Sequence, residues 1–381
     1  MGWNGTFLLN EMQDQPPHGP GESGVRRVKT RSVVALLCII AVAGAIGIVI
    51  SFSQRAQIAA VRATHTPTAA QQTLSPTPIP LEPQAGFGFS LADDLATHDI
   101  VMFGGVGDFP NTWLWKGSKW TLAHPSVSPA GRFGASAAYD PQTESVMLFG
   151  GRLEPGMPVD DTWAWNGSNW DDLDSGVGVS GPPPGEGSDM AWDPATSQMI
   201  LLTRSGVISS PAETWVWAGS YWSQPAGATL PPGATYSPMG FDPVTNALLA
   251  VGCCVGPPPA TGAVNTTWKW NGVFWTMLPT SINAPIDGST MALDPTAGRL
   301  DLCDCDSSAT GGSDLSAWDG SGWAPLPGAA LPLVGGVEIT DSDRHELLLL
   351  GSAPSASASG ESPVGVWRWT GSSWLQIGPK P

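Results

Sequence analysis

Residues 112–120 read Thr-Trp-Leu-Trp-Lys-Gly-Ser-Lys-Trp, and variants of this stretch recur five times later in the chain. Self-similarity at a regular interval is the sequence signature of a repeat architecture. The six copies together hold 17 of the 19 tryptophans, so most tryptophans are explained by the architecture before any function is considered. The glycine of the motif recurs every 48 to 53 residues, at positions 117, 167, 219, 272, 320 and 371.

A second motif lies ahead of each tryptophan motif. Residues 139–143 read Tyr-Asp-Pro-Gln-Thr, and an apolar run at 146–149 follows them. Asp-Pro favours a tight turn, because proline fixes φ and the aspartate side chain accepts hydrogen bonds from the turn's amides. Matching aspartates occur once per repeat, at 94, 140, 193, 242, 294 and 341.

Each repeat therefore predicts four short strands. In the second repeat we expect them at 134–139, 146–149, 161–165 and 168–173. Side chains two residues apart lie on the same face of a strand, so the Trp-x-Trp pair would pack against a neighbouring repeat. One repeat cannot bury both faces alone. The sequence thus predicts an all-β, six-bladed propeller over residues 86–381, with blades at 86–124, 131–175, 186–225, 235–279, 287–326 and 334–378.

The repeat resembles the kelch repeat. The resemblance is carried by Phe149-Gly150-Gly151, by the Thr-Trp-x-Trp-x-Gly of residues 162–167, and by Trp170. Kelch repeats form β-propellers, and the resemblance extends to the propeller domain of galactose oxidase. The copies drift, since Gly-Gly is kept only in the first two and Ser316 replaces the first tryptophan of the fifth.

The first 85 residues are not expected to belong to the propeller. Residues 1–32 are polar and predict a disordered cytoplasmic tail. Residues 33–52 contain an unbroken apolar run of 18 residues at 33–50, long enough to span a membrane as a helix. Four basic residues just before this run predict a cytoplasmic N-terminus and an outer propeller. Residues 53–85, rich in Thr, Pro and Ala, predict a disordered stalk. A cleaved signal peptide stays open as an alternative, because Ser51-Phe52-Ser53 is a small-x-small site.

The charge of the outer part excludes one class of partner. From residue 86 onward the chain has 10 Lys and Arg against 29 Asp and Glu. A surface this negative repels phosphate backbones, so nucleic acid is not an expected partner. We expect a monomeric propeller, linked to the membrane by its one helix, with a glycan or protein ligand outside.

Any binding site is predicted on the face that carries the long loops, near the central channel. Tight turns join strands one to two and three to four, whereas long loops such as 176–188 and 255–264 join the others. Function on such scaffolds concentrates in long loops held by a rigid frame. The charged residues in or beside these loops are Arg132, Arg152, Arg204, Glu154, Asp160, Glu186 and Glu213.

No catalytic or metal-binding constellation is singled out by the sequence, and no cofactor is predicted. A copper oxidase would need converging His and Tyr ligands, but the propeller has only three of each, in different strand contexts. We therefore favour a binding or interaction module over an enzyme. The alternatives are a hydrolase or lyase acting on polysaccharide, which would need paired carboxylates, and a structural surface spacer.

Four cysteines form a second prediction. Cys253-Cys254 and Cys303-x-Cys305 occupy equivalent places at the ends of second strands in neighbouring repeats. An oxidising compartment favours disulfides, and four cysteines allow three pairings. Free thiols and a thiolate metal site stay open as alternatives.

Overall fold

The computed structural model describes most of the predicted propeller. The predicted tail at 1–32, the predicted span at 33–52 and nearly all of the stalk at 53–85 lie outside the described residues. Within the described part of the chain, no helix is long and apolar enough to cross a membrane. The described ranges are 82–84, 87–106, 110–154, 156–174, 181–185, 187–203, 212–227, 238–252, 265–282, 289–305, 315–326, 330–333, 335–351 and 363–379.

All regular elements in these ranges are β-strands, and they form six antiparallel sheets of four strands, which we number in chain order. Sheet 1 holds β1 (Ser90–Asp94), β2 (Asp99–Phe103), β3 (Thr112–Trp115) and β4 (Trp120–Leu122). Sheet 2 holds β6 (Ser136–Asp140), β7 (Ser145–Phe149), β10 (Thr162–Trp165) and β11 (Trp170–Asp172). Sheet 3 holds β12 (Asp189–Asp193), β13 (Gln198–Thr203), β14 (Glu213–Trp217) and β15 (Trp222–Ser223).

The remaining three sheets repeat the same order. Sheet 4 holds β16 (Met239–Asp242), β17 (Ala247–Gly252), β18 (Asn265–Trp270) and β19 (Trp275–Ile282). Sheet 5 holds β20 (Thr290–Asp294), β21 (Arg299–Cys303), β22 (Leu315–Trp318) and β23 (Trp323–Pro325). Sheet 6 holds β24 (Val337–Asp341), β25 (Glu346–Gly351), β26 (Gly365–Trp369) and β27 (Trp374–Gln376). A small extra sheet, which the sequence did not predict, joins β5 (Arg132–Phe133), β8 (Arg152–Leu153) and β9 (Met157–Pro158).

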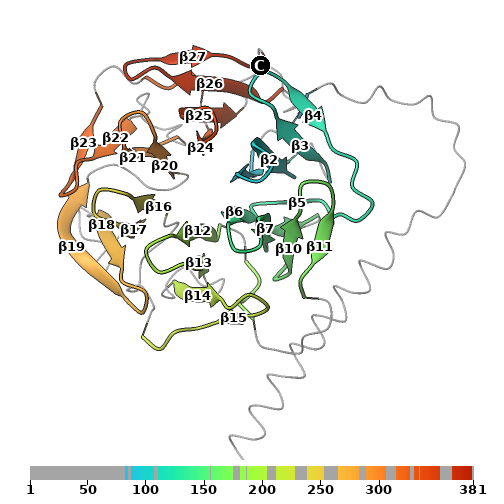
Figure 1. Cartoon of the computed structure of the whole chain (residues 1–381), viewed down its shortest axis with the longest axis horizontal. Helices are drawn as coiled ribbons and strands as arrows, with labels where there is room; N and C mark the ends of the chain where they lie inside the picture. The colour runs from blue at the N-terminus through green and yellow to red at the C-terminus, as the bar shows by residue number, and fades with distance from the viewer. Residues whose placement is uncertain are drawn as a thin grey trace, which may run out of the picture. The chain divides into compact units, whose positions relative to one another are not determined.

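The six sheets stand around a common centre (Figure 1). The first strand of each sheet contacts the first strand of the next, in the order β1, β6, β12, β16, β20, β24 and back to β1. Each four-stranded sheet is built from one continuous stretch of chain, with no strand borrowed from another sheet in the described residues. The architecture is that of a β-propeller, with the first strands innermost.

The turns explain why each repeat keeps its aspartate and its glycine. The carboxylate of Asp140 accepts hydrogen bonds from the backbone N–H of Gln142 at 2.9 Å and from the Thr143 hydroxyl at 3.1 Å, which closes the turn between β6 and β7. The equivalent aspartates accept the same kind of bond in the other five sheets. The glycine of the tryptophan motif, such as Gly167, has a φ near +90° in the turn between the third and fourth strands, where a side chain is strained.

The tryptophans of the motif pack between sheets, as expected. Trp163, Trp165, Trp217 and Trp270 are between 1% and 9% exposed. The indole N–H of Trp170 also donates to the Thr112 hydroxyl of the preceding sheet at 2.9 Å. The same bond recurs between sheets 2 and 3, 3 and 4, and 4 and 5.

The two junctions of sheet 6 depart from this pattern. Trp374 in sheet 6 has no hydrogen-bond partner for its indole N–H, because sheet 5 carries Leu315 where sheets 1 to 4 have threonine. Trp120 in sheet 1 donates instead to the Val364 carbonyl of sheet 6, at 3.3 Å. Sheets 1 and 6 therefore meet directly.

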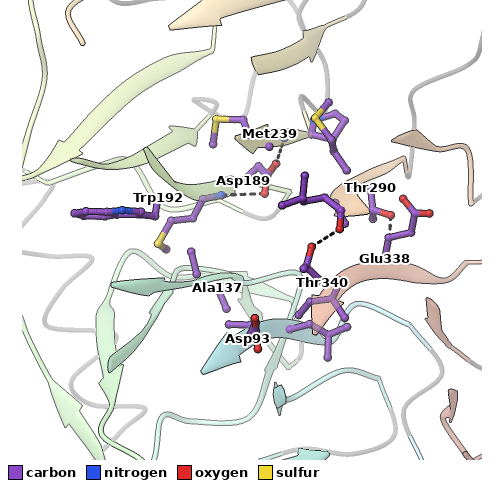
Figure 2. A pocket seen from close by; sticks show the side chains of 18 of the residues that line it. Asp93, Ala137, Asp189, Trp192, Met239, Thr290, Glu338 and Thr340 are labelled. Carbon is purple, nitrogen blue, oxygen red and sulfur yellow. Dashed lines mark hydrogen bonds between the residues drawn. The ribbon is translucent and has the colours of Figure 1, made fainter. Parts of the chain in front are cut away.

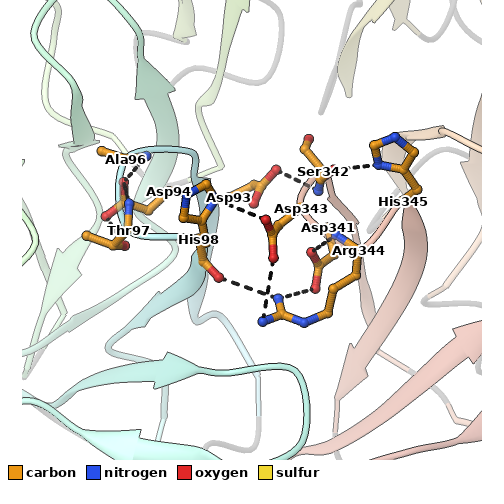
Figure 3. A network of polar contacts seen from close by, with 10 residues as sticks. All are labelled: Asp93, Asp94, Ala96, Thr97, His98, Asp341, Ser342, Asp343, Arg344 and His345. Atoms are coloured by element: carbon orange, nitrogen blue, oxygen red, sulfur yellow. Dashed lines mark hydrogen bonds and ion pairs between the residues drawn. The ribbon is translucent and has the colours of Figure 1, made fainter.

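Polar contacts at the inner turns reinforce this closing junction (Figure 3). The Arg344 guanidinium binds the Asp341 carboxylate at 2.9 Å and the His98 carbonyl of sheet 1 at 3.4 Å. His98 lies 3.1 Å from the Asp343 carboxylate, and the Ser342 amide donates to Asp93 at 3.0 Å. Side-chain contacts and a backbone hydrogen bond from the Val364 amide to the Pro83 carbonyl at 2.9 Å join the ends of the described ring, and no strand is exchanged among the described residues.

Candidate functional site

A cavity of about 530 Å³ lies at the centre of the ring, and residues from all six first strands line it (Figure 2). It extends from the ends of the loops that lead into these strands, at Ser188 and Ser289, to the turns that follow them, at Pro141 and Ser342. Pockets of this size bury small organic ligands, and a few polar groups in their walls set the orientation.

The shared aspartates put the six first strands in register, so their residues can be compared position by position. The residue just before the aspartate, which we call position −1, borders the cavity in every sheet. Three consecutive sheets place half-buried aromatic rings there, whereas the other three do not. In order from sheet 1 to sheet 6, position −1 holds Asp93, Tyr139, Trp192, Phe241, Leu293 and Thr340.

Trp192 is the residue that sequence reasoning missed. Every other tryptophan of the described chain belongs to the repeated motif, but Trp192 stands on β12 and borders the cavity. The signal was present, because Trp192 departs from the repeat, although it also packs against the core between sheets 2 and 3. A search for exceptions to the motif, rather than for its members, finds it.

Position −3 carries a second exception, Glu338. Five sheets have small or apolar residues at this position, namely Leu91, Ala137, Met190, Met239 and Met291. Glu338 is 5% exposed, and neither of its carboxylate oxygens has a hydrogen-bond partner. Burial raises the pKa of Glu338 well above its ordinary value, and the charges of Asp301 and Asp294 add to the rise. The Cys303 amide opposes this shift, although it lies outside hydrogen-bond geometry.

Two further acids border the cavity with raised pKa values. Burial raises the pKa of Asp93 to about 6, although hydrogen bonds from Ser342 oppose the rise. Burial also raises the pKa of Asp189 to about 7, against hydrogen bonds from the amides of Met190 at 2.9 Å and Met239 at 2.6 Å. Asp189 is only half-buried because it borders the cavity, but the surrounding strands still desolvate its carboxylate.

Replacing Glu338 with methionine is expected to stabilise the protein at pH 8 by about 1–3 kcal/mol, because a buried, unpartnered polar group is lost. Because the pKa of Glu338 is higher in the folded state than in the unfolded chain, its contribution to stability falls as pH rises above the ordinary value of 4.5. The gain should therefore be smaller at pH 5 than at pH 8. Urea unfolding of the full chain at both pH values measures it.

The matched control is Leu91→Met, at the same position of sheet 1, which removes no charge and should change stability by less than about 1.5 kcal/mol at either pH. A Glu338→Met protein that is less stable than wild type at pH 8 contradicts the assignment of Glu338 as an unpartnered acid.

The structure places the charged residues predicted from sequence away from this cavity. Arg152 is half-buried and donates to the Gly156 carbonyl at 2.9 Å, and Glu154 beside it is exposed. Asp160 and Glu213 are half-buried, and neither borders the cavity. Arg204 and Glu186 lie outside the described residues. First strands wall the cavity, and binding by these charged residues on the long-loop face stays a prediction.

Arg132 is part of a buried ion pair, and its binding role stays a prediction. Its side chain is 1% exposed, and its guanidinium binds both carboxylate oxygens of Asp161, at 2.6 and 3.0 Å. It also donates to the carbonyls of Gly150 at 2.9 Å and Ala130 at 3.0 Å. These bonds hold the segment before sheet 2 against the start of its third strand, and they leave the guanidinium shielded from solvent.

Cys303 and Cys305 form a disulfide with a Cα–Cα distance of 5.2 Å. This bridge lies at the end of β21, within one repeat, and not between neighbouring repeats. Cys253 and Cys254 lie outside the described residues. Among the residues that the structure does describe, no group of three or more His, Cys, Asp or Glu is placed to hold a metal ion.

No known family profile matches this chain, and no curated protein sequence does. Solved structures do resemble it. YjhT superposes with a TM-score of 0.51 at 13% identity, over 78% of this chain and 99% of YjhT. AofleA from Arthrobotrys oligospora gives 0.52 at 14% identity, over 77% of this chain and 86% of AofleA. A complex of Aleuria aurantia lectin with α-methyl-L-fucoside gives 0.49 at 15% identity, over 78% and 96%.

The fold is β-propeller-like. Structural similarity at 13–14% sequence identity is evidence for the fold alone. It supports the propeller arrangement already seen in the sheets, and it does not identify a ligand. The resemblance to the kelch repeat stays a prediction, since no family profile supports it.

Proposed function

We propose that this protein is a binding module whose β-propeller holds a carbohydrate ligand in its central cavity. In this proposal the propeller is six-bladed, kelch-like and monomeric, and it stands outside the cell on a stalk anchored by the helix predicted at 33–52. The row of three aromatic rings, Tyr139, Trp192 and Phe241, carries the proposal.

The chemistry of the wall suits a sugar ring. The apolar face of a sugar packs on aromatic side chains, while its hydroxyl groups donate to carboxylates, which only accept when ionised. The cavity offers an aromatic ring and a carboxylate side by side, because Tyr139 and Asp93 occupy position −1 of the neighbouring sheets 2 and 1. A rigid frame of strands holds these groups in place, which lowers the entropy that binding must overcome.

A hydrolase or lyase acting on polysaccharide is the second candidate. Asp93, Asp189 and Glu338 come from three different sheets, and all have raised pKa values, which is a mark of acid–base sites. Against it, two backbone amides hold the Asp189 carboxylate, as expected of a structural group. Assaying binding and product formation on one panel of oligosaccharides separates the two candidates.

Replacing Trp192 with alanine is expected to weaken saccharide binding by roughly tenfold or more, because buried aromatic contacts dominate such sites. Isothermal titration calorimetry of the full chain in detergent, with the oligosaccharides that the panel selects, measures the loss. The control is Phe274→Ala, which removes an aromatic ring that is 48% exposed on an outer turn.

Binding that is unchanged in Trp192→Ala but lost in Phe274→Ala would move the site from the cavity to the outer turns. A panel in which no saccharide binds or is cleaved would leave the third possibility, a structural spacer, and overturn the proposal.

A further inference from the structure

One junction of the ring has two acids where the other five have two apolar residues. The residue seven places after each turn aspartate, which we call position +7, lies on the second strand of its sheet. At five junctions it shares a hydrophobic cluster with position −3 of the next sheet. These apolar pairs are Val101 with Ala137, Met147 with Met190, Ile200 with Met239, Leu249 with Met291, and Leu348 with Leu91.

The pair at the sixth junction, between sheets 5 and 6, is Asp301 with Glu338. Asp301 lies on the same face of β21 as Cys303, because side chains two residues apart share a face of a strand. Cys303 packs in one cluster with Leu347 and Leu349 of sheet 6. The Asp301 carboxylate therefore faces sheet 6.

Glu338 faces the same contact from the other side. It lies on the same face of β24 as Thr340, whose hydroxyl donates to the Leu293 carbonyl of sheet 5 at 2.7 Å. The charges that act on the Glu338 carboxyl are those of Asp301 and Asp294, and both belong to sheet 5. The two acids thus meet in the contact between sheets 5 and 6.

Both acids are buried, and both keep carboxylate oxygens without a hydrogen-bond partner. Asp301 is 0% exposed, and Arg299 donates to its Oδ1 at 3.1 Å, whereas its Oδ2 has no partner. Neither oxygen of the buried Glu338 has one. Two carboxylates in one buried contact repel each other, and burial penalises both charges. A proton on Glu338 removes one charge and makes that carboxyl a donor.

The outer part of the same contact is also exceptional. At the other five junctions, within the described residues, the tryptophan of the fourth strand donates its indole N–H to the preceding sheet. Trp374 does not, since Leu315 stands in place of the threonine. Sheets 5 and 6 therefore lack the bond that would hold them together if the inner contact became charged.

The remaining charges around β24 are held elsewhere. On β25 of the same sheet, Glu346 is bound by Arg368 at 2.8 Å. On the side of sheet 1, Asp93 accepts from the Ser342 amide at 3.0 Å. At the end of β24, Asp341 is bound by the Arg344 guanidinium. Arg299 is the one cation beside the acid pair in the described residues, and it binds Asp301 and not Glu338.

We infer that the contact between sheets 5 and 6 is a pH-sensitive seam, in which a proton on Glu338 lets its carboxyl pack against Asp301 and loss of that proton loosens the two sheets. The seam belongs to the frame of the propeller, so it does not depend on which ligand the cavity takes. As pH rises, the ring should loosen first at this one place.

The sign of the pH response follows from the burial of the pair. Burial raises the pKa of Glu338 well above 4.5, and it raises the pKa of Asp301 to about 6, although Arg299 opposes the second rise. A carboxyl whose pKa is higher in the folded state makes its full contribution to stability below its ordinary pKa. That contribution is lost as pH rises through the folded value. The seam is therefore tight in acid and loosens in alkali.

Amide hydrogen exchange of the full chain in detergent, read by mass spectrometry, locates the loosening. Wild type and Glu338→Gln are compared at the same pH, so that the intrinsic pH dependence of exchange cancels. Glutamine has the size of a protonated glutamate and does not ionise. We expect equal exchange in the two proteins at pH 6. At pH 9 we expect peptides from β20, β21 and β24 to exchange at least about tenfold faster in wild type, and peptides from sheets 2 and 3 to exchange equally.

Infrared difference spectra test the proton itself. The spectrum of wild type minus that of Glu338→Gln at pH 7 should contain the C=O stretch of a protonated carboxyl. A carboxylate band in its place would mean that Glu338 is ionised at pH 7, which contradicts the inference.

Two further variants show whether the acid pair causes the response. The double variant Asp301→Leu with Glu338→Met copies the apolar pair Leu249 and Met291 of the preceding junction, so it should exchange as Glu338→Gln does at both pH values. The control is Asp343→Asn, which removes an exposed acid at the junction of sheets 6 and 1 and should keep the wild-type response. Unfolding curves show whether each variant is folded.

Three results overturn the inference. In the first, the strands of sheets 5 and 6 exchange at pH 9 as slowly in wild type as in Glu338→Gln. In the second, wild type exceeds the variant equally in all six sheets, which indicates loosening of the whole ring. In the third, Asp343→Asn abolishes the response, which assigns it to the junction of sheets 6 and 1. If the double variant does not fold, the comparison of wild type with Glu338→Gln still decides.

Discussion

Replacing Trp170 with alanine is expected to lower the free energy of unfolding by about 3–5 kcal/mol, since large-to-small changes of buried aromatic residues leave a cavity. Trp170 is 1% exposed, and its ring centroid lies 5.3 Å from that of Phe103 in sheet 1 and 5.5 Å from that of Trp165. It thus joins two sheets through its ring as well as through its hydrogen bond to Thr112. Chemical denaturation followed by fluorescence measures the loss.

Thr112→Val separates the two contributions of Trp170. Valine keeps the shape of threonine but removes the hydroxyl that accepts the indole N–H at 2.9 Å. This change should lower stability by about 1–3 kcal/mol, because the buried donor is left unsatisfied. A Trp170→Ala protein within about 1 kcal/mol of wild type would show that packing between sheets does not depend on this motif.

Replacing Arg132 with alanine is expected to cost a similar amount, about 3–5 kcal/mol, for an electrostatic reason. Asp161 is 4% exposed, so without Arg132 its charge stays buried and loses its cationic partner, although the indole N–H of Trp163 still donates to it at 2.7 Å. Thermal and urea unfolding, with saccharide binding measured at a temperature where the variant is folded, test both consequences.

The double variant Arg132→Met with Asp161→Asn serves as its control, because it removes both charges together. It should recover part of the stability that the single change loses. If Arg132→Ala instead folds as stably as wild type but no longer binds saccharide, the original prediction of a binding role for Arg132 was right and the structural role is wrong.

The repeat made the fold predictable from the sequence. Fixed spacing, the turn aspartates and the Trp-x-Trp pair each have a local physical cause, so the strands of the second repeat lie within about two residues of where they were expected. The extra sheet of β5, β8 and β9 was not predictable, because strands of two residues carry no periodicity.

The site was less predictable, for two reasons. Charge alone does not tell a buried ion pair from a surface loop, and Arg132 shows this, since its partner Asp161 is 29 residues away in sequence. The cavity acids and Trp192 are recognisable only once the first strands are aligned and their exceptions compared. The disulfide of Cys303 with Cys305 is one of the three pairings that the sequence left open, because sequence spacing does not show which sulfur atoms meet.

Photoaffinity mapping tests the central claim, that a ligand occupies the cavity of the propeller, most directly. The full chain is cross-linked with a diazirine derivative of the tightest-binding saccharide, digested and sequenced by mass spectrometry, with unlabelled saccharide as competitor. The account predicts competed labels on the first strands, above all on β1, β6 and β12, and their loss in Trp192→Ala. Competed labels confined to the outer turns, such as the one that carries Phe274, would contradict it.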